Sequence, residues 1–372
     1  MKIPLAKPQI LESDIDAVVA VLRTPNLALG PKLTEFEDAV ASYVGSPFAV
    51  AVNSGTSALH LAVRCLDLKE GDEVIVPSFA FPAVANVLLQ ERLTPVFVDI
   101  DATTLNITAA AIEQAIGPKT RAAIVVHTFG HPAEMDAICE VTRRHKLALI
   151  EDACEALGAE VRGRRVGAFG DAGLFAFYPN KQITLGEGGV LVTSDPAMAR
   201  RAKVLRSQAK DDSLDWARQH VEVGYSYRIA DINCALGTAQ LGRLEEILQA
   251  REQLARTYDA RLRDCAGIVR PPIDCAYGRI SWFAYVIQLA PKSGRADRDR
   301  VWQCLLDRGI GAGRYFASLH GQPVLNGKYR QSGSLAITES VAARALALPF
   351  FVGMTEAEVD EVCDTLVEFL GP

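Results

Sequence analysis

FAFYPNKQITLGEGG, residues 175–189, is the stretch on which the interpretation of this 372-residue chain depends. An apolar, strand-like run ends at Pro179, Lys181 follows, and a glycine-rich turn comes next. A lysine at the end of a strand is well placed to form a Schiff base with a carbonyl cofactor, provided that its amine is neutral. A lone lysine is more often an exposed surface residue, so the assignment depends on the segments around it.

A second segment, LALIEDACEALGA at residues 147–159, places two carboxylates directly after an apolar strand. In a parallel α/β sheet, ligands bind at the carboxyl ends of the strands. We therefore assign Asp152 to the ring nitrogen of pyridoxal phosphate, where a carboxylate keeps the nitrogen protonated and the ring able to accept electrons. The alternative for Asp152 is a helix N-cap. Glu151 is expected to point away, as a cap or an ion-pair partner.

A third segment, residues 48–66, has the pattern of a strand, a turn of small residues and a helix. Gly55, Thr56 and Ser57 form the turn. Free amide and hydroxyl groups at the start of a helix suit a phosphate. A plain capped helix start is the alternative.

A fourth segment, residues 73–86, carries two aromatic residues just after a strand, Phe79 and Phe81. An aromatic side chain in this position is able to lie flat on a planar cofactor ring. Core packing is the ordinary fate of a phenylalanine, and we expect it for one of the two.

These motifs, with several others in a fixed order, carry a resemblance to a known family. The chain resembles the DegT/DnrJ/StrS-type aminotransferases, which are pyridoxal-phosphate enzymes of fold type I that mostly act on nucleotide-linked keto-sugars. The resemblance covers nearly the whole chain. It rests on residues 30–37, 55–57, 77–86, 95–101, 127–136, 151–153, 181–189, 224–228, 239–241 and 315–320.

The resemblance implies a role for each matching residue. Lys181 carries the cofactor and moves the proton during amino transfer, and Asp152 pairs with the pyridine nitrogen. Phe81 stacks on the ring, and residues 55–57 hold the phosphate. Arg228 matches a residue that reaches into the neighbouring subunit's site, which implies a homodimer with shared active sites.

Several positions depart from the family pattern, among them Leu157, where histidine is frequent. Ala176 stands where the family often has a phosphate-binding serine, and Asn180 or Tyr178 is expected to compensate. Ser226 replaces an asparagine before Tyr-Arg. Glu155 replaces a frequent glutamine that faces the cofactor, so it changes the charge there.

Further residues are assigned to the substrate or left open. Tyr315 and His320 lie in a segment that borders the family's substrate pocket, and we expect them at the substrate. Arg314 either contacts an anionic substrate or forms a surface ion pair. His127 and His131 flank Gly130 at a strand end and either contact a ligand or pack internally.

Composition is that of an ordinary globular protein, with 49% hydrophobic and 23% charged residues. The net charge of −6 does not suggest nucleic-acid binding, which needs a basic domain or stripe. The eight cysteines lack zinc-ribbon spacing, so no metal site is expected. No signal-peptide core or membrane-spanning stretch is recognised. We expect a cytoplasmic protein with no membrane partner.

The fold class expected is α/β. Apolar strand-like runs lie near residues 48–52, 73–77, 95–99, 122–126, 147–151, 172–177 and 189–193, with helical spacing between most of them. This alternation predicts a large, mostly parallel sheet sandwiched by helices. Residues 1–245 are expected to form this cofactor-binding domain with an N-terminal arm, and residues 246–372 a smaller α+β domain.

The predicted activity is amino transfer from an amino acid, with glutamate expected and glutamine as the alternative donor, to a keto-sugar in amino-sugar biosynthesis. Three alternatives stay open. They are a keto-cyclitol or other ketone as acceptor, a pyridoxal-phosphate enzyme of different outcome, such as elimination, and a cofactor-binding regulatory protein without turnover.

Overall fold

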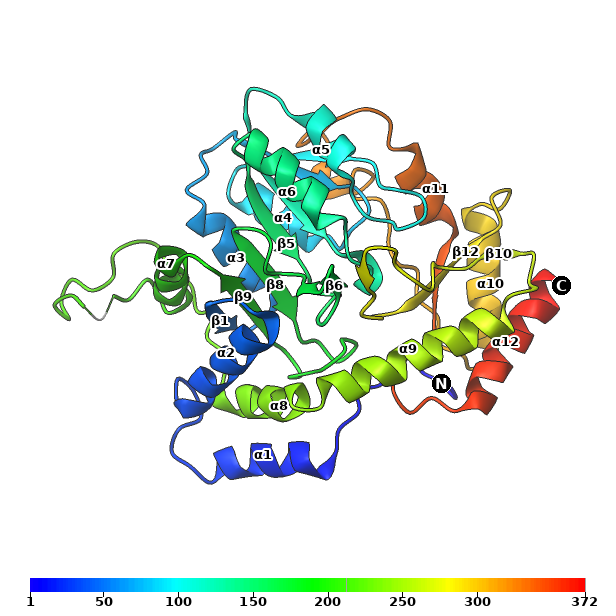
Figure 1. The fold of residues 1–372 in the computed structure, drawn as a ribbon, viewed down its shortest axis with the longest axis horizontal. Coiled ribbons are helices and arrows are strands. Elements are labelled where there is room, and N and C mark those ends of the chain that lie inside the picture. Colours follow the sequence, from blue (N-terminus) through cyan, green and yellow to red (C-terminus); the bar gives the residue numbers. More distant parts are fainter. Residues whose placement is uncertain (212, 372) are drawn as a thin grey trace.

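An eight-stranded, mostly parallel sheet forms the centre of the computed structural model, which describes residues 1–211 and 213–371 (Figure 1). Among these strands, β9 pairs antiparallel with both neighbours, and every other neighbouring pair is parallel. In spatial order the strands are β1 (Phe48–Val52), β9 (Gly189–Thr193), β8 (Ala172–Ala176), β5 (Ala148–Asp152), β4 (Thr120–Val126), β2 (Glu73–Pro77), β3 (Thr94–Val98) and β13 (Arg330–Gln331).

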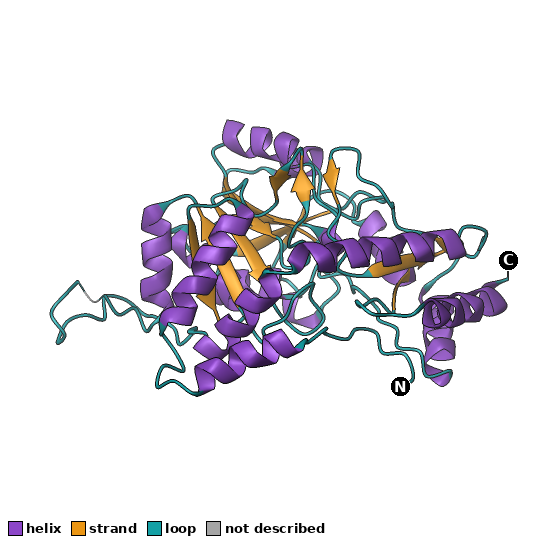
Figure 2. Cartoon of the chain, turned by 60° about the horizontal axis from the view of Figure 1, so that its bottom comes forward, coloured by secondary structure: helices purple, strands orange, loops and turns teal. Residues whose placement is uncertain are grey.

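Helices cover both faces of this sheet, as Figure 2 shows. Side chains alternate along each strand, so in β1 Ala49 and Ala51 enter one core cluster while Val50 and Val52 enter the other. The first cluster includes α2 (Pro31–Val44), α5 (Ala109–Ala115), α6 (Met135–Arg144), α8 (Asp231–Leu241) and the start of α9 (Leu244–Arg261). The second includes α3 (Gly55–Cys65), α4 (Ala83–Gln90) and α7 (Pro196–Arg206).

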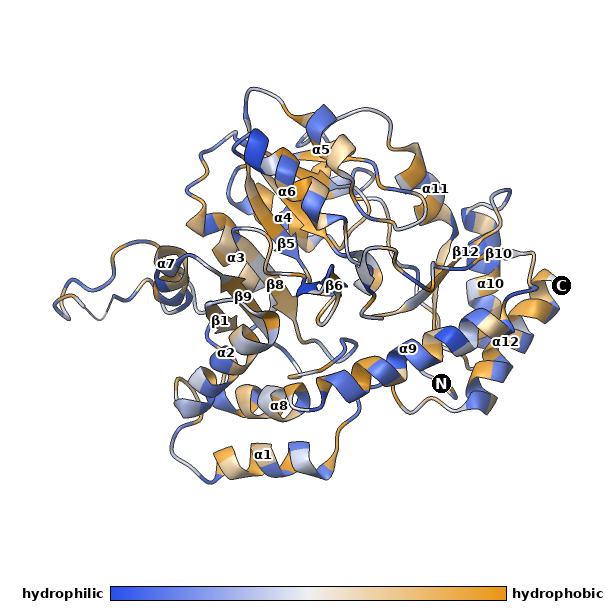
Figure 3. Cartoon of the chain, viewed as in Figure 1, coloured by the Kyte–Doolittle hydropathy of each residue, from blue (hydrophilic) through white to orange (hydrophobic). Residues whose placement is uncertain are grey.

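A smaller three-stranded sheet has a core of its own. It contains β10 (Ile268–Val269), β12 (Tyr285–Leu289) and β14 (Ala345–Leu348), and it packs with α10 (Arg295–Asp307), α12 (Glu356–Leu370) and the second half of α9. The hydropathy colouring shows α9, which runs from the large part to the small one, with alternating polar and apolar residues (Figure 3). The remaining elements are α1 (Glu12–Leu22), α11 (Ala336–Arg344), the 3-10 turns η1 (Thr128–Gly130) and η2 (Pro323–Leu325), and the short strands β6 (Glu160–Val161), β7 (Arg164–Arg165) and β11 (Gly278–Arg279).

The fold class predicted from the sequence is confirmed, and the predicted strands lie within two residues of those observed. Two separate helices, α8 and α9, lead from the large sheet toward the smaller one. The division between residues 245 and 246 falls in the first turn of α9 and stays a prediction.

Two segments pack against the domain to which this predicted division does not assign them. Strand β13 belongs to the large sheet, where Arg330 forms a two-pronged ion pair with Glu73 at 3.0 and 2.9 Å. The first residues of the chain pair instead with the smaller part, since Lys2 donates its backbone N–H to the carbonyl of Gly309 and Ile3 accepts from Gly311.

Glu151 organises the edge of the sheet beside Asp152. Its fully buried carboxylate accepts backbone N–H bonds from Gly167, Phe169 and Gly170 at 2.6–2.8 Å. His127 Nδ1 accepts from a backbone amide, so the proton is on Nε2, 3.3 Å from Glu151 Oε2. Glu151 therefore ties β5 to the turn that precedes β8.

We expect Glu151→Gln to lower the free energy of unfolding by roughly 1–3 kcal/mol, because the new NH₂ group cannot accept a bond from a buried backbone N–H. Urea denaturation measures the difference. Glu140→Gln, on the exposed face of α6, is the control and is expected to change little. Equal losses in the two variants would contradict this role for Glu151.

Candidate active site

A cavity of about 480 Å³ opens at the carboxyl ends of the parallel strands. Loops after β1, β2, β5 and β8 line it, together with Phe283, Tyr315 and Phe316 from later in the chain. Most of the predicted site residues are among those lining the cavity: Gly55, Thr56, Phe81, Asp152, Glu155, Asn180, Lys181 and Tyr315.

Lys181 lies in the turn after β8, with its side chain only 13% exposed. Its Nζ atom is 3.8 Å from Glu155 Oε1 and 4.2 Å from the centre of the Phe283 ring. The buried Arg251 holds the backbone of this segment by donating to the carbonyls of Trp282 and Phe283, at 2.6 and 2.7 Å. The amine is thus held between a carboxylate and an aromatic face.

Asp152 is the last residue of β5 and lines the same cavity as Lys181. Its Oδ1 atom accepts from the backbone N–H of Cys154 at 3.1 Å, which fixes the direction of the carboxylate. Burial raises the pKa of the neighbouring Cys154 thiol well above its ordinary value, so this cysteine stays protonated.

Glu155 is a second carboxylate in the cavity. Its Oε2 atom accepts from the backbone N–H of Phe129 at 2.9 Å, and Phe129 adopts a left-handed conformation with φ of 54°. Burial raises the pKa of Glu155, while Lys181 and the Phe129 N–H oppose part of that rise.

The start of α3 faces the cavity with free amides. Ser54 caps the helix by accepting from the N–H of Ser57 at 3.1 Å. Within residues 1–211 and 213–371, no acceptor bonds the N–H of Gly55 or Thr56. A side chain at Gly55 would place its Cβ 2.7 Å from Ala176 Cβ, so this approach requires glycine.

A model of the DegT/DnrJ/EryC1/StrS aminotransferase family matches residues 8–367. The chain belongs to this family. GDP-perosamine synthase of Caulobacter vibrioides is 38% identical to this aminotransferase over 99% of the chain and 98% of the relative.

Solved structures agree with this membership. Helicobacter pylori PseC, an aminotransferase involved in the biosynthesis of pseudoaminic acid, has a TM-score of 0.93 at 27% identity and covers 99% of both chains. Spr1654 from Streptococcus pneumoniae, solved in a PLP form and a PMP form, has a TM-score of 0.93 at 26% identity; its PLP form covers 99% of this chain and 98% of that one. The enzyme is therefore a fold type I aminotransferase whose cofactor is pyridoxal 5′-phosphate (PLP).

The residues of this aminotransferase fit that cofactor. The cavity contains one lysine amine, a fixed carboxylate and free helix N–H groups, which are the groups that an aldehyde, a pyridine nitrogen and a phosphate require. Asn180 Oδ1 is buried in the described part of the chain without any hydrogen-bond partner, and this residue lines the cavity. A bound group that donates to it would satisfy this atom.

The two candidate aromatics have different environments. Phe79 is fully buried in a core cluster, whereas Phe81 lines the cavity and is 60% exposed. Phe81 is thus the ring that remains available for stacking.

Not every predicted residue lines this cavity. Ser57 donates its hydroxyl to Asn53 Oδ1 at 2.7 Å. His320 bonds Ser78 and Glu339, at 2.7 and 3.1 Å. Arg314 stacks over Trp302 and forms an ion pair with Asp299. Of the two roles expected for Arg314, the structure therefore favours the surface ion pair over a substrate contact within the same chain.

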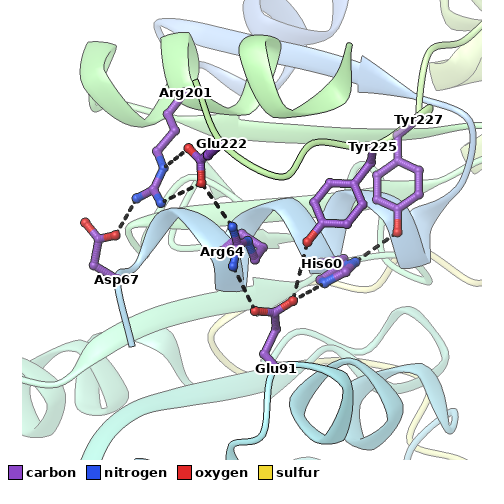
Figure 4. A network of polar contacts seen from close by, with 8 residues as sticks. All are labelled: His60, Arg64, Asp67, Glu91, Arg201, Glu222, Tyr225 and Tyr227. Carbon is purple, nitrogen blue, oxygen red and sulfur yellow. Dashed lines mark hydrogen bonds and ion pairs between the residues drawn. The ribbon is translucent and has the colours of Figure 1, made fainter. Parts of the chain in front are cut away.

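Ser226 and Arg228 lie on the segment that returns from the projecting loop after α7 (Figure 1). Figure 4 shows how this segment is anchored: Glu222 pairs with Arg64 and Arg201, and the ring of Tyr225 packs on His60. Neither Ser226 nor Arg228 lines the cavity of its own chain. Arg228 bonds only Ser226 Oγ among the described residues, at 2.9 Å.

Sequence reasoning missed Phe283 and Phe316. They come from the segment just before β12 and the segment before α11, more than 100 residues after Lys181, and they resemble any other core aromatic in the sequence. His127 and His131 were left open, and both are internal: the first bonds Glu151 and the second the carbonyl of Pro132.

The raised pKa of Glu155 predicts a pH effect on stability. A carboxyl group whose pKa is higher in the folded than in the unfolded protein stabilises the fold fully at pH values below its unfolded-state pKa. That stabilisation is lost as the pH rises through its folded-state pKa. We expect the stability of the cofactor-free enzyme, relative to Glu155→Gln, to fall as pH rises from the ordinary pKa of a glutamate toward neutrality. Urea denaturation across this range tests it.

Glu187→Gln is the control, since Glu187 also lines the cavity but is exposed. A difference between wild type and Glu155→Gln that stays constant with pH would contradict the assignment.

Proposed function

We propose that the enzyme transfers an amino group from L-glutamate to a nucleotide-linked keto-sugar, for amino-sugar biosynthesis in the cytoplasm. The observation that carries the proposal is that Lys181 and Asp152 line one cavity with the free N–H groups of α3. The 38% identity to a GDP-perosamine synthase supports a sugar as the acceptor.

Bound in this cavity, PLP supplies a carbonyl that condenses with amines and a ring that withdraws electrons. Asp152 holds a proton at the ring nitrogen, and its bond from Cys154 N–H keeps the carboxylate directed there. The Gly55 and Thr56 amides bind the phosphate. Phe81 covers the ring.

Lys181 is the group that moves the proton between the two carbon atoms of the amino transfer. Glu155, 3.8 Å from Nζ, stabilises the lysine while it is charged, and the Phe283 face limits its movement on the other side. A general acid–base must lie within hydrogen-bond reach of its target. The short turn after β8 places Lys181 in the lining of the cavity.

The charge balance of the cavity supports a shared site in a homodimer. Its lining contains three carboxylates, from Asp152, Glu155 and Glu187, and Lys181 as the cation. A phosphate and a nucleotide diphosphate both need positive partners. Arg228, which lacks a carboxylate partner among the described residues, is our proposed contribution from the neighbouring subunit.

We expect glutamate to convert the bound cofactor to its amine form, and a nucleotide-linked keto-sugar to restore it with release of the amino-sugar. Absorbance spectra and mass spectrometry of the product measure both halves. Lys181→Ala is expected to lose at least 10³-fold in rate and to yield no borohydride-fixed cofactor at residue 181. Conversion of keto-cyclitols but no keto-sugar would favour the alternative acceptor, and the absence of conversion by any amino acid would refute amino transfer.

A complementation experiment tests the shared site. We expect Lys181→Ala and Arg228→Ala homodimers each to be defective. If Arg228 acts across the interface, a mixed dimer of the two variants contains one intact site and recovers up to half of the wild-type activity per dimer. Recovery is not expected if Arg228 serves its own chain, because each site then carries one substitution. A monomer in sedimentation experiments would also contradict the shared site.

A further inference from the structure

A second cavity, of about 220 Å³, is lined in part by Phe129. Residues 102–105, which follow β3, and His131 form one wall. The strand β12 and residues 269–272 form the other. Neither the sequence motifs nor the amino-transfer chemistry accounts for this space.

A buried amide faces this cavity without a partner. Ala284, Val286 and Gln288 occupy alternate positions along β12, so they share one face of the strand, and all three line the cavity. The side chain of Gln288 is 8% exposed and makes no hydrogen bond within residues 1–211 and 213–371. Its amide atoms are not sealed from solvent, so a group that binds in the cavity is able to bond them.

The opposite wall presents a buried acceptor. His131 is 8% exposed, and its Nδ1 atom bonds the carbonyl of Pro132 at 3.0 Å, so the proton is on Nδ1. Nε2 therefore carries a free lone pair, for which the described residues supply no donor. Burial lowers the pKa of His131, which keeps the ring neutral.

The remaining lining is mostly apolar. Trp282, Ile280 and Phe129 supply flat or aliphatic surface, and Arg270 is held at the edge by its ion pair with Asp259. A cavity of about 150 Å³ is large enough for benzene. The space is therefore sufficient for one substituted ring.

We propose that this second cavity is a binding site for a small planar ring compound that carries a hydroxyl or N–H group. The group donates to His131 Nε2 and pairs with the amide of Gln288, while the ring lies against Trp282. The site shares Phe129 with the active site, since the N–H of Phe129 binds Glu155 and its ring stacks on Phe316 at 5.4 Å.

Calorimetric titration of the holoenzyme with phenol tests the proposal, with toluene as the matched ligand that lacks the hydroxyl. We expect saturable phenol binding that is tighter than toluene binding. Gln288→Leu is expected to weaken phenol at least tenfold and to reverse the preference. Gln303→Leu, on the exposed side of α10, is expected to bind as wild type does.

A second variant keeps the test valid if Gln288→Leu fails to fold. Thr103 is exposed at the rim and its hydroxyl makes no bond within the described chain, so Thr103→Phe is expected to fold and to block phenol. Absence of saturable binding, equal phenol affinity in all variants, or a crystal soaked in phenol that shows only water in the cavity would overturn the proposal. None of these readouts depends on turnover.

Discussion

The parallel pairing of β5 with β8 is the constraint on which the site depends. Asp152 lies opposite Leu174 in the ladder, so the chain leaves both strands at the same edge of the sheet. The carboxylate is the last residue of β5, and the turn after β8 brings Lys181 back to the same cavity. Glu151, one residue earlier, uses its carboxylate to bind the turn before β8. Two adjacent acids thus have separate tasks because successive strand residues point to opposite faces.

The electrostatics of the cavity follow from what surrounds the lysine. Glu155 lies 3.8 Å from its amine, and the cationic Arg251 donates to the backbone carbonyls of Trp282 and Phe283. Among the described residues that line the cavity, the charged ones are three carboxylates and the single cation Lys181. The free N–H groups at the start of α3 add positive potential to that of Lys181.

Much of the fold and part of the site were predictable from sequence. Apolar runs of five residues between helical segments identified the strands, and polar residues directly after them identified Asp152, Lys181 and the α3 turn. Long-range contacts were not predictable. Arg314 stacks on the face of Trp302, and Phe283 reaches the cavity from the segment before β12. Such choices depend on tertiary neighbours that local pattern does not encode.

The position of β13 has a consequence for synthesis of the chain. Strand β3 receives its outer neighbour from residues 330–331, so during translation its edge carries unpaired backbone groups until nearly the whole polypeptide has left the ribosome. The first residues of the chain also stay unpaired until late in synthesis, because Lys2 and Ile3 pair with residues 309–311. The nascent large sheet therefore has an open edge until residues 330–331 have been synthesised.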